Sequence, residues 1–399
     1  RLRQLRERVL RIRELLDCLM STHPTASAVR LLSRLVLVGQ ERASIRALIT
    51  SNSSLLAAKV AERSAETGEH YITRDWPQYR SMLRKAAGGG ALTGGTTLLK
   101  FMIMGLGLSA FWGGFWAGAM YAASFVVIQL LHCTLATKQP AMTAPAMAAK
   151  LKDIGTPEAV NAFVDEVAHL MRSQAAAVLG NVLVVFPVVL LLSVGIGLLL
   201  GHPMLSAKDA AYTLHSLSLL GPTLLFAGFT GCLLFASSII AGWVENWFVL
   251  RRLDSAMRYN PGITGILGVE RAGRWAHFMR NNISGFASNI SLGFMLGLIP
   301  PIMAFFSLPL EVRHVTLSAG QLAAASVAYG VQTVFMPAFW WAVAAIPLIG
   351  ALNLGVSFYL AYQLALRAHN VSGVQRAHIH QAIWARWRHR PLSFFIPAG

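Results

Sequence analysis

Residues 173–207 read SQAAAVLGNVLVVFPVVLLLSVGIGLLLGHPMLSA, a run of 35 residues without Asp, Glu, Lys or Arg. Four further charge-free runs cover 101–137, 210–244, 281–310 and 314–366. A helix of about 20 apolar residues crosses the hydrocarbon core of a bilayer, so each run is long enough for one crossing. The last run, of 53 residues, also leaves room for a re-entrant or surface helix. The sequence therefore predicts an all-α, polytopic helical membrane protein.

Composition supports this class of protein. Of the 399 residues, 55% are hydrophobic and 13% are charged, whereas a soluble domain has about 25% charged residues. The first of six predicted spans is the least apolar, because it is rich in Gly and Thr and contains Lys100. We expect its small residues to let it pack closely on its neighbours. The spans lie near 87–107, 111–133, 175–200, 217–244, 284–307 and 336–365, in three hairpins.

The basic residues predict the orientation. Of the 34 Lys and Arg residues, sixteen lie in 1–86, four in 134–174, six in 245–283 and five in 366–399. Lys208 and Arg313 are the only basic residues in the alternate loops. Because basic loops stay on the cytoplasmic side, we expect a multi-pass protein of the bacterial inner membrane with both termini in the cytoplasm. Lys208 and Arg313 should face the periplasm, in outer amphipathic helices near 204–216 and 311–328.

These patterns divide the chain into seven parts. Residues 1–86 form a helical, basic cytoplasmic head, in which Asp75, Trp76 and Pro77 start a short helix. The chain does not open with Met, so we expect the head to be a piece of a longer N-terminal region. The net charge of +17 predicts contact with anionic lipid headgroups. After the head come a transmembrane hairpin (87–134), a cytoplasmic loop (135–174), a second hairpin (175–245), a loop (246–283), a third hairpin (284–365) and a basic aromatic tail (366–399).

An internal repeat runs through the spans. The sequence AHLMR at 168–172 recurs as AHFMR at 276–280, an offset of 108, and Asn181 matches Asn289 at the same offset. Each copy continues into a proline-containing span. Both copies start on the same side of the membrane, so the repeat is parallel. Duplicated hairpins occur in transporters, and a purely structural bundle would show the same pattern.

Polar side chains inside predicted spans are candidates for function, because they cost free energy in lipid. We expect Lys100 to extend outward, Glu245 to meet basic residues or water, and Asn181 and Asn289 to form interhelical hydrogen bonds. No catalytic motif, cofactor motif or spaced metal cluster is recognisable. The candidates are Lys100, Gln129, His132, Asn181, Glu245, Asn246, Asn289, Gln332 and Asn353.

Three motifs carry a resemblance to a known family. They are the stretch Thr137-Lys138-Gln139-Pro140, the two His-x-x-Arg segments (His169 with Arg172, and His277 with Arg280), and the Asn-Pro-Gly turn at 260–262. In these three places the chain resembles a bacterial membrane-protein family named site-specific recombinase. The likeness covers the chain from about residue 70 onward. The name implies DNA strand exchange, and the two His-x-x-Arg segments fit the pattern of tyrosine recombinases. Both segments, however, stand just ahead of a predicted span, where an arginine also serves as an anchor.

Three functions stay open from the sequence. A membrane scaffold or transporter-like module fits the parallel repeat and the embedded polar groups. DNA recombination is what the family name implies, although we do not expect nucleic acid as a partner of this piece of chain. A lipid-interacting or envelope-assembly role fits the basic aromatic tail. A homo-oligomer or a membrane partner fits each of these functions.

Overall fold

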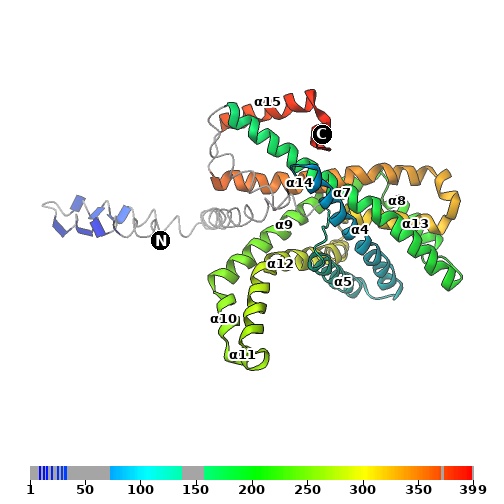
Figure 1. Ribbon diagram of the computed structural model, residues 1–399, viewed down its shortest axis with the longest axis horizontal. Helices are drawn as coiled ribbons and strands as arrows, with labels where there is room; N and C mark the ends of the chain where they lie inside the picture. Colours follow the sequence, from blue (N-terminus) through cyan, green and yellow to red (C-terminus); the bar gives the residue numbers. More distant parts are fainter. Residues whose placement is uncertain are drawn as a thin grey trace. The chain divides into compact units, whose positions relative to one another are not determined.

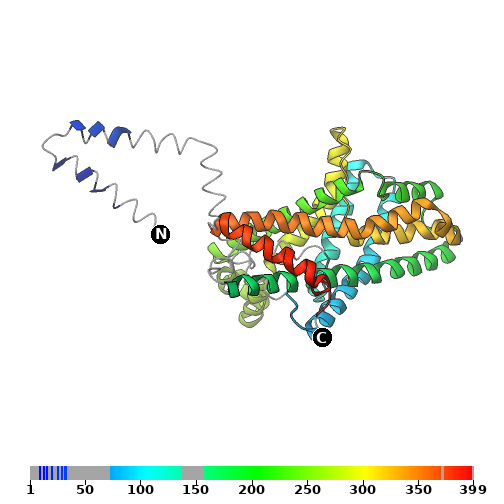
Figure 2. The ribbon, with the colours of Figure 1, turned by 90° about the horizontal axis from the view of Figure 1, so that it is seen from above.

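The computed structural model describes positions scattered between 9 and 33, and then residues 72–136, 157–369 and 373–397. The chain divides into two compact units, Arg1–Leu56 and Ala57–Gly399. The positions described in the first unit are helical. In the described ranges of the second unit every regular element is a helix (Figures 1 and 2). The all-α prediction is confirmed for these residues.

The second unit consists of long helices joined by short ones. The long helices are α4 (Trp76–Gly105), α5 (Ala110–Leu130), α7 (Pro157–Leu200), α9 (Thr223–Leu250), α12 (Val269–Phe305) and α14 (Pro337–His369). The shorter helices are α8 (Ala207–Ser216), α10 (Leu253–Tyr259), α11 (Pro261–Leu267), α13 (Val315–Tyr329) and α15 (Gly373–His389), with 3₁₀ helices η3 (Gly330–Phe335) and η4 (Pro391–Phe394).

Side-chain caps set where several helices begin. The Asp75 carboxylate accepts the backbone N–H of Gln78 at 2.8 Å, and Pro77 follows in the first turn of α4. Asn260 accepts the N–H of Gly262 at 2.8 Å and so caps α11. Both are favourable N-terminal sequences, because the cap satisfies an amide that has no partner within the helix. The short helix expected at Asp75 and the first expected span are one continuous helix, α4.

Five helices are long and apolar enough to cross a membrane: α5, α7, α9, α12 and α14. They overlap the last five of the six predicted spans, although α5 ends at Leu130 and α9 begins at Thr223, three residues before the end and six residues after the start of the spans predicted there. The first predicted span, 87–107, lies in α4, which is not among the five. Helix α4 has 30 residues and packs along α7, where Gly90 faces the backbone of Asn181 and Gly94 faces Val188. The glycines of this segment therefore serve close packing, as expected.

Helices α5 and α12 are in close contact. Each helix carries a Gly-x-x-x-Gly pair at this contact, Gly114 and Gly118 on α5 and Gly293 and Gly297 on α12. A Cβ added at Gly297 would lie 2.3 Å from the Gly118 nitrogen, and one at Gly293 would lie 2.3 Å from the Ala122 nitrogen. The two backbones therefore touch directly, which only residues without a side chain allow.

Helix α13 differs from its prediction. Residues 311–328 were expected to form an outer amphipathic helix, but α13 is buried on all sides from Val315 to Gly320 and from Leu322 to Ser326. It packs against α7, α8 and α14, and a non-helical segment, 306–314, leads into it. The outer-helix prediction was wrong because the small residues Ala, Ser and Gly allow close packing on every face. The other reading of the last charge-free run, a re-entrant helix, agrees with this burial.

We predict that Gly297→Ala destabilises the protein. The added methyl group would meet backbone atoms of α5, which cannot move away unless the helices separate. Overpacking of this kind costs about 1–3 kcal/mol, so the apparent melting temperature of the purified protein in detergent should fall. The matched control is Gly113→Ala on α5, where an added Cβ meets nothing within 4 Å and alanine favours the helix. Equal melting temperatures for the two variants would contradict the direct backbone contact.

Candidate functional site

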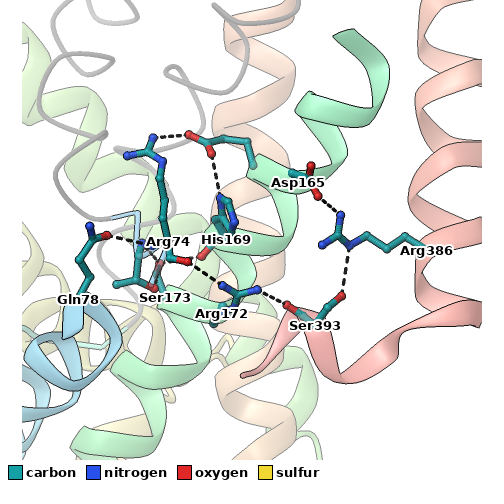
Figure 3. Close-up of polar contacts among 10 residues, drawn as sticks. Arg74, Gln78, Asp165, His169, Arg172, Ser173, Arg386 and Ser393 are labelled. Carbon is teal, nitrogen blue, oxygen red and sulfur yellow. Dashed lines mark hydrogen bonds and ion pairs between the residues drawn. The ribbon is translucent and has the colours of Figure 1, made fainter. Parts of the chain in front are cut away.

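The first His-x-x-Arg segment lies in α7 and is buried in a polar cluster. Arg172 is 4% exposed. Its guanidinium donates to the Ser393 carbonyl at 2.9 Å and to the Arg74 carbonyl at 3.4 Å (Figure 3). Arg172 thus connects the segment before α4, the middle of α7 and the 3₁₀ helix η4, which is near the end of the chain. The guanidinium serves here as a link between backbones.

Glu166 contacts two side chains of the same cluster. Its carboxylate, 9% exposed, accepts from Arg74 at 2.6 Å and lies 3.1 Å from Nδ1 of His169. The spacing of His169 three residues after Glu166 places both side chains on one face of α7. The carboxylate is thus held between a guanidinium and an imidazole, and the contact fixes the orientation of His169.

Two further contacts complete this set. Arg386 of α15 pairs with Asp165 and donates to the Ser393 hydroxyl at 3.2 Å (Figure 3). We name Arg74, Asp165, Glu166, His169, Arg172, Arg386 and Ser393 the α7 cluster. Sequence reasoning missed both carboxylates of the cluster. The signal that could have found them is an acidic pair three and four residues before His169.

The second His-x-x-Arg segment, in α12, has the opposite environment. His277 is exposed, and Arg280 pairs with Asp254 of α10 at 2.5 Å. The hydrogen bond from Arg280 lowers the pKa of Asp254 below its ordinary value. The lowered pKa means that the ionised Asp254 stabilises the folded protein. This stabilisation is fully present when the pH is above the ordinary pKa of an aspartate, and it is lost as the pH falls through the lowered pKa. At neutral pH the pair therefore holds α10 against α12.

An open groove lies beside this second segment. Its volume is about 780 Å³, and it lies where the α10–α11 hairpin meets the beginning of α12 (Figure 1). None of its lining residues has a hydroxyl or thiol group. We call it the α12 groove, and its lining residues are Arg258, Val269, Glu270, Gly273, Arg274, His277, Phe278, Asn281 and Asn282.

The asparagines of the repeat are buried and hydrogen-bonded, and of the two only Asn289 bonds to another helix, as was expected for both. Asn181 is fully buried and donates to the Thr134 carbonyl at 2.9 Å. Asn289, 1% exposed, donates to Oε1 of Gln129 on α5 at 2.6 Å. Gln129 in turn donates to Oδ1 of Asn282 at 3.2 Å. Asn289 and Gln129 thus join α12 to α5, and Asn181 joins α7 to the non-helical segment after α5.

Asn353 holds the start of α13. Its amide donates to the carbonyls of Ala227 and Arg313, both at 2.9 Å. Its Oδ1 accepts the backbone N–H of Val315 at 3.1 Å. One side chain of α14 thus satisfies three backbone groups, on α9, on the non-helical segment and at the first residue of α13.

Arg313 is buried, which the sequence did not predict. The residue is 6% exposed and precedes α13, whereas it was expected within an amphipathic helix that faces the periplasm. Its guanidinium donates to the Ser216 carbonyl at 3.0 Å and pairs with Glu311 at 2.7 Å, and its backbone N–H donates to Thr230 at 2.7 Å. Charge alone does not show whether a loop folds inward, and the periplasmic side of Arg313 stays a prediction. The signal was the presence of Glu311 two residues earlier.

The remaining candidates are dispersed. Lys100 is half-buried in α4, with Nζ 5.8 Å from the centroid of the Phe101 ring. His132 is exposed in the turn after α5, with a left-handed φ of 55°. Glu245 and Asn246 are half-buried near the end of α9. One family-like motif lies outside the described residues, namely Thr137, Lys138, Gln139 and Pro140. Among the described residues no three His, Cys, Asp or Glu side chains gather as a metal site.

We predict different roles for the two arginines of the repeat. Arg172→Ala would leave two carbonyl oxygens without their donor, and hydrogen bonds to charged groups contribute about 1.5–3 kcal/mol each. The apparent melting temperature should therefore fall, and trypsin should cut residues 373–397 faster. Arg280→Ala is the matched control, because an exposed ion pair contributes about 0–1 kcal/mol. Equal losses in the two variants would show that Arg172 does not hold the end of the chain.

Comparison with known proteins agrees with the resemblance found in the motifs. A family model described as Site-specific recombinase matches residues 1–397, which extends the likeness through the N-terminal head. No curated protein and no solved structure matches the chain. The match spans nearly the whole chain, and the protein therefore belongs to the site-specific recombinase family.

Proposed function

We propose that this protein is a transporter-like module of the bacterial inner membrane, with six spans and cytoplasmic termini. In this proposal α4 is the sixth span beside the five apolar helices, and the α7 cluster and the α12 groove face the cytoplasm. The observation that carries the proposal is the buried helix α13 with the non-helical segment before it. A simple scaffold of spanning helices has no need of such an element.

The position of this segment supports the proposal. Asn353, which binds the start of α13, lies sixteen residues after the first residue of α14. At 1.5 Å per residue this is about 24 Å along the helix, just past the middle of the predicted span 336–365. Non-helical backbone at such depth is tolerated only where protein buries it or where it lines a cavity. The hydrogen bonds from Asn353 and Thr230 supply the required partners.

The charges near this segment also favour transport over a structural role. Arg313 and Glu311 form an ion pair between two charge-free runs, and Tyr212 of α8 donates to Glu311 at 3.1 Å. Ionisable groups embedded among spans are costly and usually belong to a solute or proton path.

A parallel duplication fits the same proposal. In each proposed copy a long helix is followed by a short helix and a second long helix, α7–α8–α9 and α12–α13–α14. Val315, the first residue of α13, follows Ala207, the first residue of α8, by 108 residues, the offset of the His-x-x-Arg segments. Parallel repeats about an axis normal to the membrane are one plan of secondary transporters.

DNA recombination is the second candidate, favoured by the family description. Strand exchange needs a nucleophile beside a basic cluster on a surface that a duplex can reach. Arg172 instead is buried and holds backbone carbonyls, and Arg280 is paired with Asp254. The α12 groove is basic and open, but no hydroxyl or thiol group lines it. The geometry of the two segments therefore supports structural roles better than catalysis.

Cysteine accessibility tests the transporter-like function. In a variant with Cys18, Cys133 and Cys232 replaced by serine, we expect Thr316→Cys at the start of α13 to react with a small charged methanethiosulfonate in native membranes. A path to the embedded charges requires water to reach this position. Thr316 and Ala323 are both 0% exposed, but the buried Thr316 hydroxyl has no hydrogen-bond partner among the described residues, so we expect water at Thr316 and not at Ala323. Ala323→Cys is therefore the matched control and should remain unmodified. A Thr316→Cys variant as inert as the control would indicate a solid scaffold.

Two surface cysteines fix the sides of the membrane in the same experiment. Lys208→Cys should be labelled by an impermeant maleimide in intact cells, and Arg274→Cys only after permeabilisation. This follows from the basic residues near Arg274 and their scarcity near Lys208. Labelling of Arg274→Cys in intact cells would reverse the proposed orientation.

For recombination we predict a negative result. Purified protein should neither cleave nor exchange supercoiled DNA, because the arginines of the repeat are engaged elsewhere. Arg280→Lys keeps the positive charge and removes the guanidinium fork that grips a phosphate, so it is the diagnostic variant. DNA cleavage by the wild type that disappears in Arg280→Lys would establish catalysis and refute the proposal.

A further inference from the structure

We propose that the α12 groove binds the headgroup of an anionic phospholipid. This inference goes beyond the proposed transporter-like function and does not depend on it. The groove is formed by α10 and α12, which the Arg280–Asp254 pair holds together. It is open on one side, as a site must be if its ligand enters from the surrounding bilayer.

The charges of the groove select an anion. Arg258 on α10 and Arg274 on α12 line it from two directions, and His277 lies one turn beyond Arg274. Glu270 is the only acidic residue in the lining. Asp254 does not add a second free negative charge, because Arg280 neutralises it. A phosphate between the two arginines would receive the bidentate hydrogen bonds that guanidinium groups favour.

The position of the groove favours a lipid over a soluble anion. Arg280 is the last charged residue before the 30-residue charge-free run that begins at Asn281, and Asn281 itself lines the groove. The groove thus lies where α12 changes from charged to apolar sequence, the level at which headgroups lie. Basic pockets beside spanning helices at this level are known to hold anionic headgroups.

Apolar side chains around the groove suit acyl chains and glycerol. Phe278 and Val269 line it, and both are exposed, Val269 to 69%. On the adjoining hairpin Ile266 is 86% exposed and Tyr259 is 67% exposed, and neither α10 nor α11 has a buried residue. An apolar surface continuous with a basic pocket matches a phospholipid, which has one charged end and one apolar end.

Lipid titration by native mass spectrometry tests this site. The full chain in detergent is titrated with phosphatidylglycerol and, separately, with phosphatidylcholine. We expect the wild type to prefer phosphatidylglycerol, and Arg258→Gln/Arg274→Gln to lose this preference by about fivefold for each arginine removed. The matched control, Arg80→Gln/Arg84→Gln, removes two exposed arginines near the beginning of α4 and should keep the preference.

Further measurements distinguish a lipid from other anionic ligands and show whether each variant is folded. Arg258→Lys/Arg274→Lys should retain most of the preference, and a monodisperse elution profile shows that each variant is folded. The proposal is overturned if the wild type shows no preference, or if the groove and control variants behave alike. It is also overturned if millimolar inorganic phosphate displaces phosphatidylglycerol, or if the groove variant loses binding of a short DNA duplex while its lipid binding is unchanged. None of these measurements depends on solute access to α13, so the two proposals fail separately.

Discussion

The direct backbone contact between α5 and α12 is the constraint on which much of the second unit depends. In lipid, helices gain little from hydrophobic burial against each other, so close packing and interhelical hydrogen bonds decide their association. Gly118 and Gly297 bring the two backbones together. The same approach puts Gln129 within reach of Asn289 and Asn282. The position of α12, which carries one wall of the α12 groove, therefore follows from the absence of side chains at four positions.

The two His-x-x-Arg segments show how little a short motif determines. Arg172 and Arg280 occupy equivalent places in sequence, yet one is buried against two carbonyl oxygens and the other forms an exposed pair with Asp254. The difference arises from what packs outside each helix. The segment before α4 and the end of the chain cover α7 at Arg172, whereas at Arg280 the partner of α12 comes from the short α10–α11 hairpin. The chemistry of each arginine is thus set by its neighbours and not by the motif.

Charge-free runs predicted the long helices well, because the length of an apolar run depends on local sequence alone. They could not predict neighbours. The Gly-x-x-x-Gly contact, the burial of α13 and the inward position of Arg313 each depend on residues more than 80 positions away. Asn289 finds another helix, as expected, because an amide inside a span has no solvent partner, whereas Asn181 meets the same need at the non-helical Thr134 carbonyl and within α7. The α7 cluster combines four separate stretches of sequence and could not be read from any one of them.

The buried Arg313 links packing to the proposed function. A guanidinium removed from water is tolerated only with an acidic partner and hydrogen-bond acceptors, and Glu311 and the Ser216 carbonyl supply them. A scaffold would gain more from an apolar residue at this position, since replacing a buried ion pair with packed hydrophobic side chains is often neutral or stabilising. Asn353 and Thr230 then fix the backbone on either side of the guanidinium. Burying the Arg313 guanidinium costs desolvation energy, and the residue lies beside a helix that begins inside the bundle. These two features suit a group that binds a solute. We therefore favour a solute path over a purely structural role.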